Sequence, residues 1–342
     1  MYITFAHALI PKLSCIGSFF VNPLTVYIVW SDKKLNLGNY RYLLLYFACF
    51  NMCSSLADML VPMCVLNHRY AFSVFISDGF FEQYSEFHQF ILAFRCSFIS
   101  VTYAVLHAHF LYRFLVLFNN QILAQYFVPY GLLLTVFYSF FHIAFWTVAC
   151  WHYIGGDYER RMYIREPMFE TYGTDSLNMT IIIAQYREGT FDALLKSWIG
   201  IGSMSVLSIF SLCLIFVLGY QIVSRLRSQT MEMSEKTKKL QTQLMKALVV
   251  QAAIPTCVSF SPCLFAWYQP VFGLNLGRWI QISAAAAVST FPCLDPLAII
   301  FFVPTFRNQF KEIVLFMTPK KKNRTTCSQS QTQASTGYST QN

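Results

Sequence analysis

Two acids and one base stand inside long apolar stretches of the chain, where an ionisable side chain is costly and usually marks function. The acids are Asp58 and Asp295, and the base is Arg95. Two carboxylates that approach each other cannot both ionise cheaply, so they share a proton or hold a cation such as sodium. We expect Asp58 and Asp295 in one such layer. The alternative is two separate aspartates, each satisfied by Ser or Asn neighbours.

The residues that catalysis would need are missing. The sequence has no HExxH, GxSxG or phosphate-binding glycine loop, so the common hydrolase and nucleotide-binding motifs are not indicated. His107 and His109 are two positions apart and therefore point to different faces of a helix, which disfavours a metal pair. We expect no enzyme activity, no catalytic residue, no cofactor and no metal site.

The stretch HAHFLYRFLVL, residues 107–117, places Arg113 where a long apolar segment ends, with no acidic residue beside it. An arginine at the edge of a membrane can extend its guanidinium to the interface. Arg113 is therefore either a plain topology anchor or a contact for a partner outside the membrane. Which role is correct depends on the membrane spans that carry Arg113 and on their orientation.

The composition favours a chain surrounded by lipid. Only 12% of the 342 residues are charged and 56% are hydrophobic, whereas about a quarter of a soluble domain is charged. Seven apolar stretches are long enough to cross a membrane, which takes about 20 helical residues. The predicted spans are 13–30, 42–66, 87–110, 126–151, 198–223, 244–268 and 279–303. The same composition disfavours a secreted or cytosolic enzyme.

The basic residues predict the orientation of these spans. Lys and Arg gather in the segments that lie inside when the N-terminus is outside, as cytoplasmic loops require. The net charge of +9 is therefore a topology signal. A nucleic-acid partner is disfavoured, because the charge flanks helices and forms no separate basic domain.

The connecting segments carry weaker signals. NMT at Asn178 predicts a glycosylation site on the long outer loop, and NRT at Asn323 should stay unmodified in an inner tail. The outer stretch RYAFSVFISDGF hints at a hairpin turning at Asp78-Gly79. After Pro304, apolar residues at helical spacing predict a short amphipathic helix on the inner surface. The tail, 319–342, is expected to be disordered.

Prolines and cysteines complete the reading of the spans. Pro296 in the seventh span and Pro255 and Pro262 in the sixth each remove a helix hydrogen bond, so these helices could bend there. An outer disulfide between Cys96 and Cys150 is disfavoured. Cys96 lies 17 residues before Arg113, or about 25 Å of helix, which leaves it inside a hydrocarbon core about 30 Å thick.

The local motifs resemble one family of receptors. The overall outline resembles a G-protein-coupled receptor, and several blocks resemble the Str class of nematode chemoreceptors, the serpentine receptor class r group that includes diacetyl-type odorant receptors. These blocks, over about residues 31–316, are KKLNLGNYRYLLLYFACFN at 33–51, HFLYRF at 109–114, KKLQTQLMKALVVQAAIPTCVSFSP at 238–262, FPCLDPL at 291–297 and FRNQF at 306–310.

The resemblance implies an all-α, seven-transmembrane helix bundle of the G-protein-coupled receptor type over residues 1–318. It also implies a small-molecule odorant or soluble chemical as ligand, a heterotrimeric G protein as partner and a sensory membrane as location. Arg113 looks like the arginine that ends the third helix in rhodopsin-like receptors, although Tyr112 replaces the usual acid. The residues expected to serve activation are Asp58, Tyr112, Arg113, Lys239, Lys246, Asp295 and Pro296.

The ligand is expected between the outer halves of the third, fifth, sixth and seventh spans. Small-molecule pockets are mostly apolar and aromatic, with few polar groups. The expected lining residues are Arg95, Phe98, Thr102, Trp198, Phe265, Tyr268 and Gln281. Arg95 could also extend outward or pair with Glu86 or Glu82.

Two other classes of membrane protein compete with the receptor. A seven-helix ligand-gated channel of the insect odorant receptor kind has its N-terminus inside, which the Lys and Arg distribution disfavours. A transporter is expected to show inverted repeats and paired broken helices, and the sequence shows neither.

Overall fold

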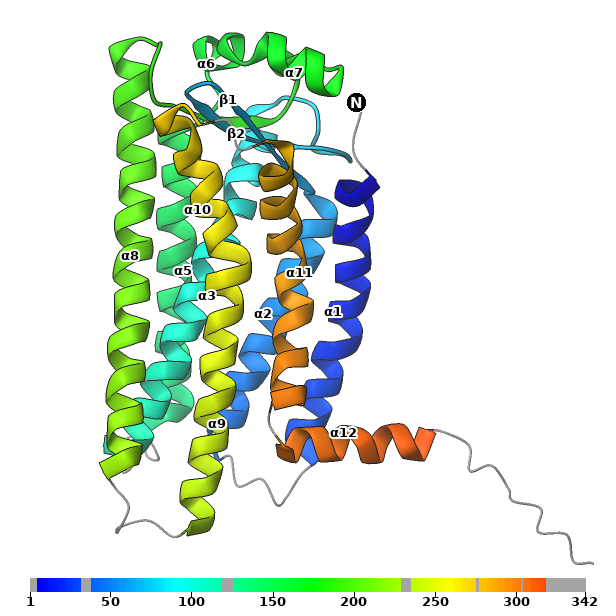
Figure 1. Cartoon of the computed structure of the whole chain (residues 1–342), viewed down its shortest axis with the longest axis vertical. Helices are drawn as coiled ribbons and strands as arrows, with labels where there is room; N and C mark the ends of the chain where they lie inside the picture. The colour runs from blue at the N-terminus through cyan, green and yellow to red at the C-terminus, as the bar shows by residue number, and fades with distance from the viewer. Residues whose placement is uncertain are drawn as a thin grey trace, which may run out of the picture.

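The chain folds into a bundle of seven long helices (Figure 1). The computed structural model describes residues 5–31, 38–118, 126–228, 235–274, 277–302 and 304–317. Each predicted span falls on one helix that is long and apolar enough to cross a membrane, which confirms the seven-helix architecture. The spans are formed by α1 (Phe5–Ser31), α2 (Tyr40–Leu60), α3 (Glu86–Phe118), α5 (Leu132–Val148), α8 (Phe191–Ser228), α9 (Glu235–Ile254) with α10 (Ser261–Tyr268), and α11 (Arg278–Phe302).

Two of these spans contain π-helical turns. The fourth span is α5 extended at its two ends by η1 (Phe127–Gly131) and η2 (Ala149–Tyr153). The sixth span changes from α9 to α10 through η4 (Pro255–Phe260), and a 3₁₀ turn, η5 (Gln269–Phe272), follows it. A π turn inside an α-helix is often found at functional sites. This one begins at Pro255, one of the prolines at which the sequence suggested a bend.

The bundle exposes large apolar side chains along its outside and keeps polar side chains buried within. Along α5, Phe137 is 70% exposed and Phe140 is 60% exposed, whereas His142 is fully buried. The His142 Nδ1 atom lies 2.8 Å from the Ser100 hydroxyl of α3. Side chains that would avoid water thus face outward, and those that need partners face each other. This is the pattern of a protein whose solvent is lipid.

One end of the bundle is covered by a cap that the sequence only hinted at (Figure 1). Its antiparallel sheet consists of β1 (Met63–His68), β2 (Ala71–Ile76) and β3 (Ile181–Gln185), in the order β1-β2-β3. Above the sheet lie α6 (Tyr158–Tyr163), α7 (Arg165–Tyr172) and the turn η3 (Ser176–Asn178). The name cap is used below for these six elements and their connections.

The cap corrects two expectations. The second span was predicted to run to residue 66, but α2 ends at Leu60 because residues 63–68 pair with β2 instead. The hairpin was expected to turn at Asp78-Gly79, but it turns at Arg69-Tyr70, where Arg69 has a φ of 45°. An apolar run of this length fits a helix or a strand equally well, and only its pairing partners decide.

Two consecutive buried arginines hold the cap together. Arg160 donates to the carbonyls of Gly155 at 2.9 Å and Ala193 at 2.7 Å. Arg161 donates to the carbonyl of Met179 at 2.6 Å and to the Gln89 side chain of α3 at 3.1 Å. Burial lowers the pKa of both guanidinium groups. The cap is thereby bonded to itself and to the third and fifth spans.

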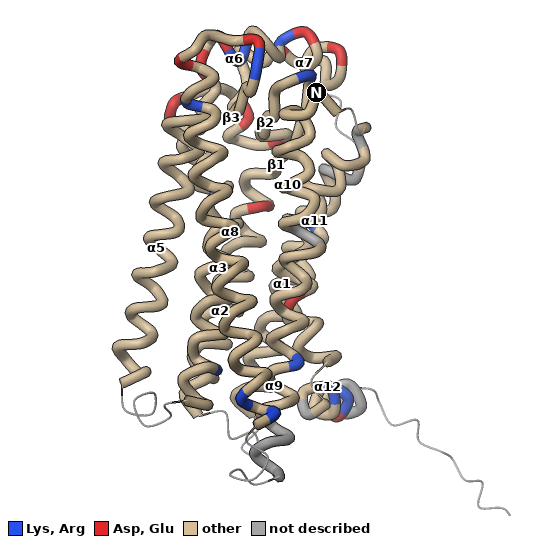
Figure 2. The backbone as a smooth tube through the Cα atoms, turned by 60° about the vertical axis from the view of Figure 1, so that its left-hand side comes forward, with Lys and Arg blue, Asp and Glu red and all other residues tan. Residues whose placement is uncertain are grey.

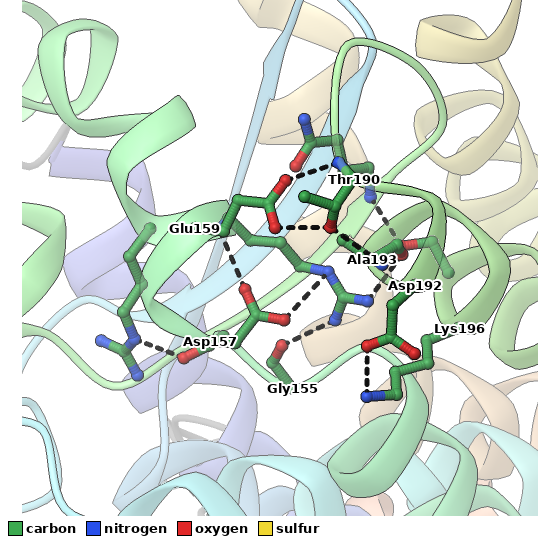
Figure 3. A network of polar contacts seen from close by, with 12 residues as sticks. Gly155, Asp157, Glu159, Thr190, Asp192, Ala193 and Lys196 are labelled. Carbon is green, nitrogen blue, oxygen red and sulfur yellow. Dashed lines mark hydrogen bonds and ion pairs between the residues drawn. The ribbon is translucent and has the colours of Figure 1, made fainter.

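Exposed ion pairs and hydrogen bonds tie the edges of the cap. Figure 3 shows Glu159 of α6 turned toward Thr190, whose hydroxyl and backbone N–H both donate to it at 2.7 Å. These hydrogen bonds hold the pKa of Glu159 below its usual value. Arg165 likewise donates to Asp175 at 2.7 Å and lowers the pKa of that carboxyl.

The opposite end of the bundle carries α12 (Pro304–Met317), which lies across the helix axes (Figure 1). Phe306 is buried under the bundle, while Arg307 and Lys311 are exposed. The predicted amphipathic helix is therefore present. Charged residues also gather at the two ends of the bundle and are sparse along its length (Figure 2). The predicted disordered tail, 319–342, lies outside the described residues.

Candidate functional site

An apolar cavity of about 50 Å³ lies between the cap and the helices. Its walls are aromatic, branched aliphatic, alanine and sulfur-bearing side chains from all three strands and from five of the seven spans. They are Met63, Val65, Phe72, Val74, Cys96, Ile99, Trp146, Cys150, Ile154, Ile182, Ile201, Met204, Cys263, Ala266, Trp267, Ala284, Ala285 and Val288. None of these side chains is charged, so the cavity suits an apolar group.

Two of the predicted lining residues face the lipid instead. Trp198 is 44% exposed and Phe265 is 60% exposed. Ala266, the position after Phe265, lines the cavity, and so does Ile201, three positions after Trp198. Because successive helical residues are about 100° apart, a small error in helical phase turns a predicted pocket residue outward. Neither Trp198 nor Phe265 lines the cavity in this structure.

The other predicted lining residues lie near the cavity or below it. Tyr268 packs against the same apolar cluster and shares a short hydrogen bond with the hydroxyl of Ser205. Gln281 is 7% exposed and lies one helical turn from Ala284 and Ala285. Phe98 and Thr102 line a second, smaller cavity of about 10 Å³. The two cavities share Ile99 and Val288 as a common wall.

Arg95 forms a buried ion pair with Asp58 beside the smaller cavity. Its Nη2 atom donates to Asp58 Oδ1 at 2.7 Å, and the two side chains are 2% and 4% exposed. Neither alternative considered for Arg95, extension outward or pairing with Glu86 or Glu82, is what the structure shows, since its partner comes from the second span. Among the described residues, the Arg95 Nε and Nη1 atoms and the Asp58 Oδ2 atom have no hydrogen-bond partner. Arg95 lines the small cavity, so its two unsatisfied nitrogen atoms are groups that a ligand or a water there could satisfy.

The predicted shared layer of Asp58 and Asp295 does not form. Asp295 is fully buried and accepts a hydrogen bond from Gln251 at 3.4 Å, and the Asn51 side chain of α2 lies beside it. Asn51 lies seven residues, or about 10 Å of helix, before Asp58 on α2. The two carboxylates thus occupy different depths and are separate, as in the alternative prediction. That alternative expected Ser or Asn neighbours for both, whereas the partner of Asp58 is Arg95.

The carbonyl that Pro296 leaves without its helical hydrogen bond is bonded by a side chain of another span. A proline lacks the N–H that would bond to the carbonyl four residues earlier, which here is Pro292. Asn22 of α1 donates to that carbonyl at 3.1 Å, and Asn51 of α2 donates to Asn22 at 3.3 Å. The seventh span is therefore bonded through Asn22 to the first and second spans.

Arg113 lies in a closed cluster at the end of the bundle opposite the cap. It is 4% exposed, and its guanidinium stacks on the Tyr40 ring at 3.7 Å. Its Nη1 atom donates to the Gln241 Oε1 of α9 at 3.3 Å. The Tyr40 hydroxyl lies 2.9 Å from His109 Nδ1. Within the described residues, the Nε and Nη2 atoms of Arg113 have no partner, so the cation is incompletely satisfied.

The remaining predicted residues lie around this cluster and on the cap. Tyr112 is buried and packs edge-on against Phe127. Lys246 is exposed on α9, whereas the side chain of Lys239 lies outside the described residues. Asn178 is exposed on the turn η3 of the cap. The sequence alone did not identify Tyr40 and Gln241 as partners of Arg113. Neither residue is charged, so neither stands out from the other residues of its sequence block.

The comparison with protein families decides between receptor, channel and transporter. A family model described as serpentine type 7TM GPCR chemoreceptor Srj matches residues 1–310. The chain belongs to this Srj family. It is 38% identical to the Caenorhabditis elegans protein named "Serpentine receptor class J-38" over 303 residues, covering 88% of this chain and 91% of that one. Srj proteins are receptors, so the prediction that the chain is not an enzyme is confirmed.

The more specific Str assignment is not confirmed. Two relatives outside class J match at lower identity over nearly the whole chain. "G-protein coupled receptor str-33" of Caenorhabditis elegans is 23% identical, with 90% of both chains covered. "Serpentine receptor class r-10" of Caenorhabditis briggsae is 25% identical, with 93% of this chain and 92% of that one covered. The motifs that suggested Str are thus compatible with several serpentine classes, and Srj replaces it.

Proposed function

We propose that this Srj protein is a chemosensory G-protein-coupled receptor of a sensory plasma membrane. It binds a small odorant or soluble chemical under the cap and activates a heterotrimeric G protein at the other end. One observation carries the proposal. The chain combines an apolar cavity at the cap end with a buried, incompletely satisfied arginine at the α12 end. The family supports the receptor class.

The cavity favours a very small, mostly apolar ligand. A cavity needs roughly 10–15 Å³ to hold one water, so about 50 Å³ has room for a handful of atoms. A larger ligand must displace side chains or extend into the neighbouring small cavity. There the free donors of Arg95 would meet a carbonyl or hydroxyl oxygen of the ligand. The chemistry is that of a small volatile with one hydrogen-bond acceptor.

Activation of the G protein would begin with release of Arg113, which is held inside the bundle at the α12 end. Arg113 connects α3 to α9 through its hydrogen bond to Gln241. The sixth span can bend at η4, where Pro255 removes a helix hydrogen bond. Movement of α9 away from α3 would break the bond to Gln241 and free the guanidinium. The carbonyls at a helix C-terminus of the G protein could then accept its N–H groups. A ligand favours this open state only by binding it more tightly.

A cell-based measurement tests the proposal. Cells expressing the chain with a promiscuous Gα are imaged for calcium across a panel of small volatile and water-soluble metabolites. We expect a dose-dependent response that is lost when Gα is removed, and also lost in Arg113→Ala at equal surface expression. A response that persists without any Gα would indicate a channel and refute the proposal.

A further inference from the structure

A long groove runs between the fifth and sixth spans. It has two parts, of about 460 and 760 Å³, which share Val223, Met245 and Val249 as walls and are therefore continuous. The fifth span α8 packs closely on α3 and the sixth span α9 on α11, whereas α8 and α9 touch each other little. Pockets that hold a small molecule measure about 300–1,000 Å³, so each part has the size of a binding site.

The body of the groove is apolar and opens toward the outside of the bundle. The 460 Å³ part has no charged side chain in its walls. Three of its wall residues, Phe216, Tyr220 and Val249, are 68%, 76% and 48% exposed. In a membrane, the medium that meets these side chains is hydrocarbon. The apolar part therefore suits an acyl chain.

The end of the groove nearest α12 is basic. Arg227 of α8 and Lys246 of α9 line the 760 Å³ part, and both are exposed. No acidic residue is among the described residues that line either part. In the predicted orientation this end faces the cytoplasm, where the leaflet contains anionic lipids, and basic pockets between spans on that side bind their headgroups. The charge of the groove is thus complementary to a phosphate.

The length of the groove matches one leaflet of a membrane. On α8 it extends over fifteen positions from Arg227 to Leu212, and on α9 over fifteen positions from Thr242 to Cys257. Fifteen positions are about 22 Å of helix, and one leaflet contributes about 15 Å to the hydrocarbon core. A lipid whose headgroup meets Arg227 and Lys246 could therefore lay a whole acyl chain along the groove.

We propose that this groove binds one anionic phospholipid of the inner leaflet. Its phosphate pairs with Arg227 and Lys246, and one acyl chain lies between α8 and α9. A second copy of this chain fits less well, because a symmetric contact through the same surface would bring identical cations together. The groove is present while Arg113 is bonded to Gln241, so a lipid that fits it would favour this closed arrangement. That last consequence rests on the proposed function, whereas lipid binding itself does not.

The proposal is tested by native mass spectrometry of the purified full-length chain in detergent. Palmitoyl-oleoyl phosphatidylserine and the phosphatidylcholine with the same acyl chains are added in equal amounts. We expect one phosphatidylserine to be retained per chain, in preference to phosphatidylcholine. Arg227→Gln/Lys246→Gln should weaken its binding about thirtyfold at low salt, since each basic residue near an anionic lipid contributes about a factor of five. The matched control is Arg307→Gln/Lys311→Gln, which removes two exposed cations of α12 at the same end of the bundle.

A second pair of variants tests the apolar part. Val249 lines both parts of the groove, so Val249→Trp should fill it and weaken phosphatidylserine binding. Val217 of α8 is 53% exposed and lies outside the groove walls, so Val217→Trp should bind normally. Ligand binding to the folded state raises its stability. Phosphatidylserine should therefore raise the melting temperature of the wild type and of Val217→Trp, but not that of a folded Val249→Trp.

Three results would overturn the proposal. Equal weakening in both double-charge variants would show that the lipid responds to net charge and not to the groove. Equal retention of phosphatidylcholine would remove the role of the two cations. A dimer that only Val249→Trp dissociates would show that a second copy of the chain occupies the groove. None of these measurements uses G-protein activation, so their failure is distinguishable from failure of the proposed function.

Discussion

Replacing Gln241 with alanine removes the hydrogen bond between α9 and the Arg113 guanidinium. A hydrogen bond to a charged group contributes about 1.5–3 kcal/mol. At 3.3 Å this bond is longer than the usual N–H···O distance, so the lower figure applies. About 1.5 kcal/mol changes the ratio of open to closed receptor roughly tenfold. If about 1% of the receptor is open at rest, the variant should reach about 10%.

The assay is ligand-independent G-protein activation, normalised to receptor at the cell surface. Gln241→Glu provides a control of opposite sign, since a carboxylate facing Arg113 strengthens the contact and should lower the resting signal. A change that merely damaged folding would lower both signals. If Gln241→Ala leaves the resting signal unchanged, or if both variants shift it in the same direction, the Arg113–Gln241 contact does not stabilise the closed state and the reasoning is refuted.

Three further predictions concern the pocket and the cap. Asp58→Asn leaves the Arg95 cation buried without its carboxylate, so the free energy of unfolding should fall by about 3–5 kcal/mol; leucine at both positions should restore much of the loss in melting temperature. Asn178→Gln should remove a glycan, seen as a gel shift matched by glycosidase treatment. Asp175→Asn should lower cap stability at neutral pH. The folded-state pKa of Asp175 is lowered by its arginine partner, so the difference in melting temperature should persist above about pH 3.9 and vanish as pH falls through that lower pKa.

The sequence was sufficient for the bundle because hydropathy over about 20 residues is a strong signal. The cap was harder to predict. Residues 63–68 continue the apolar run of the second span, and only their pairing with residues 71–76 makes them a strand. That pairing is extended by residues 181–185, more than a hundred positions away. No local pattern contains this information.

The sequence was sufficient to identify single residues of the candidate site but not the contacts between them. Arg113 and Arg95 were identified because a cation in an apolar stretch is conspicuous. Their partners were not, because Gln241 and Asp58 lie 128 and 37 positions away. Helical phase was a second source of error. Trp198 has the right composition for a pocket but lies one position from the inward face.

The most direct test separates ligand binding at the cap end from G-protein activation at the α12 end within one variant. Ala284 lines the cap cavity and is 2% exposed, so Ala284→Phe fills the cavity without touching the Arg113 cluster. Combined with Gln241→Ala, it should abolish the response to an agonist found in the screen while the raised resting activation of Gα remains. An agonist response that survives this substitution at normal surface expression would contradict the account, because the ligand would then bind outside the cap cavity.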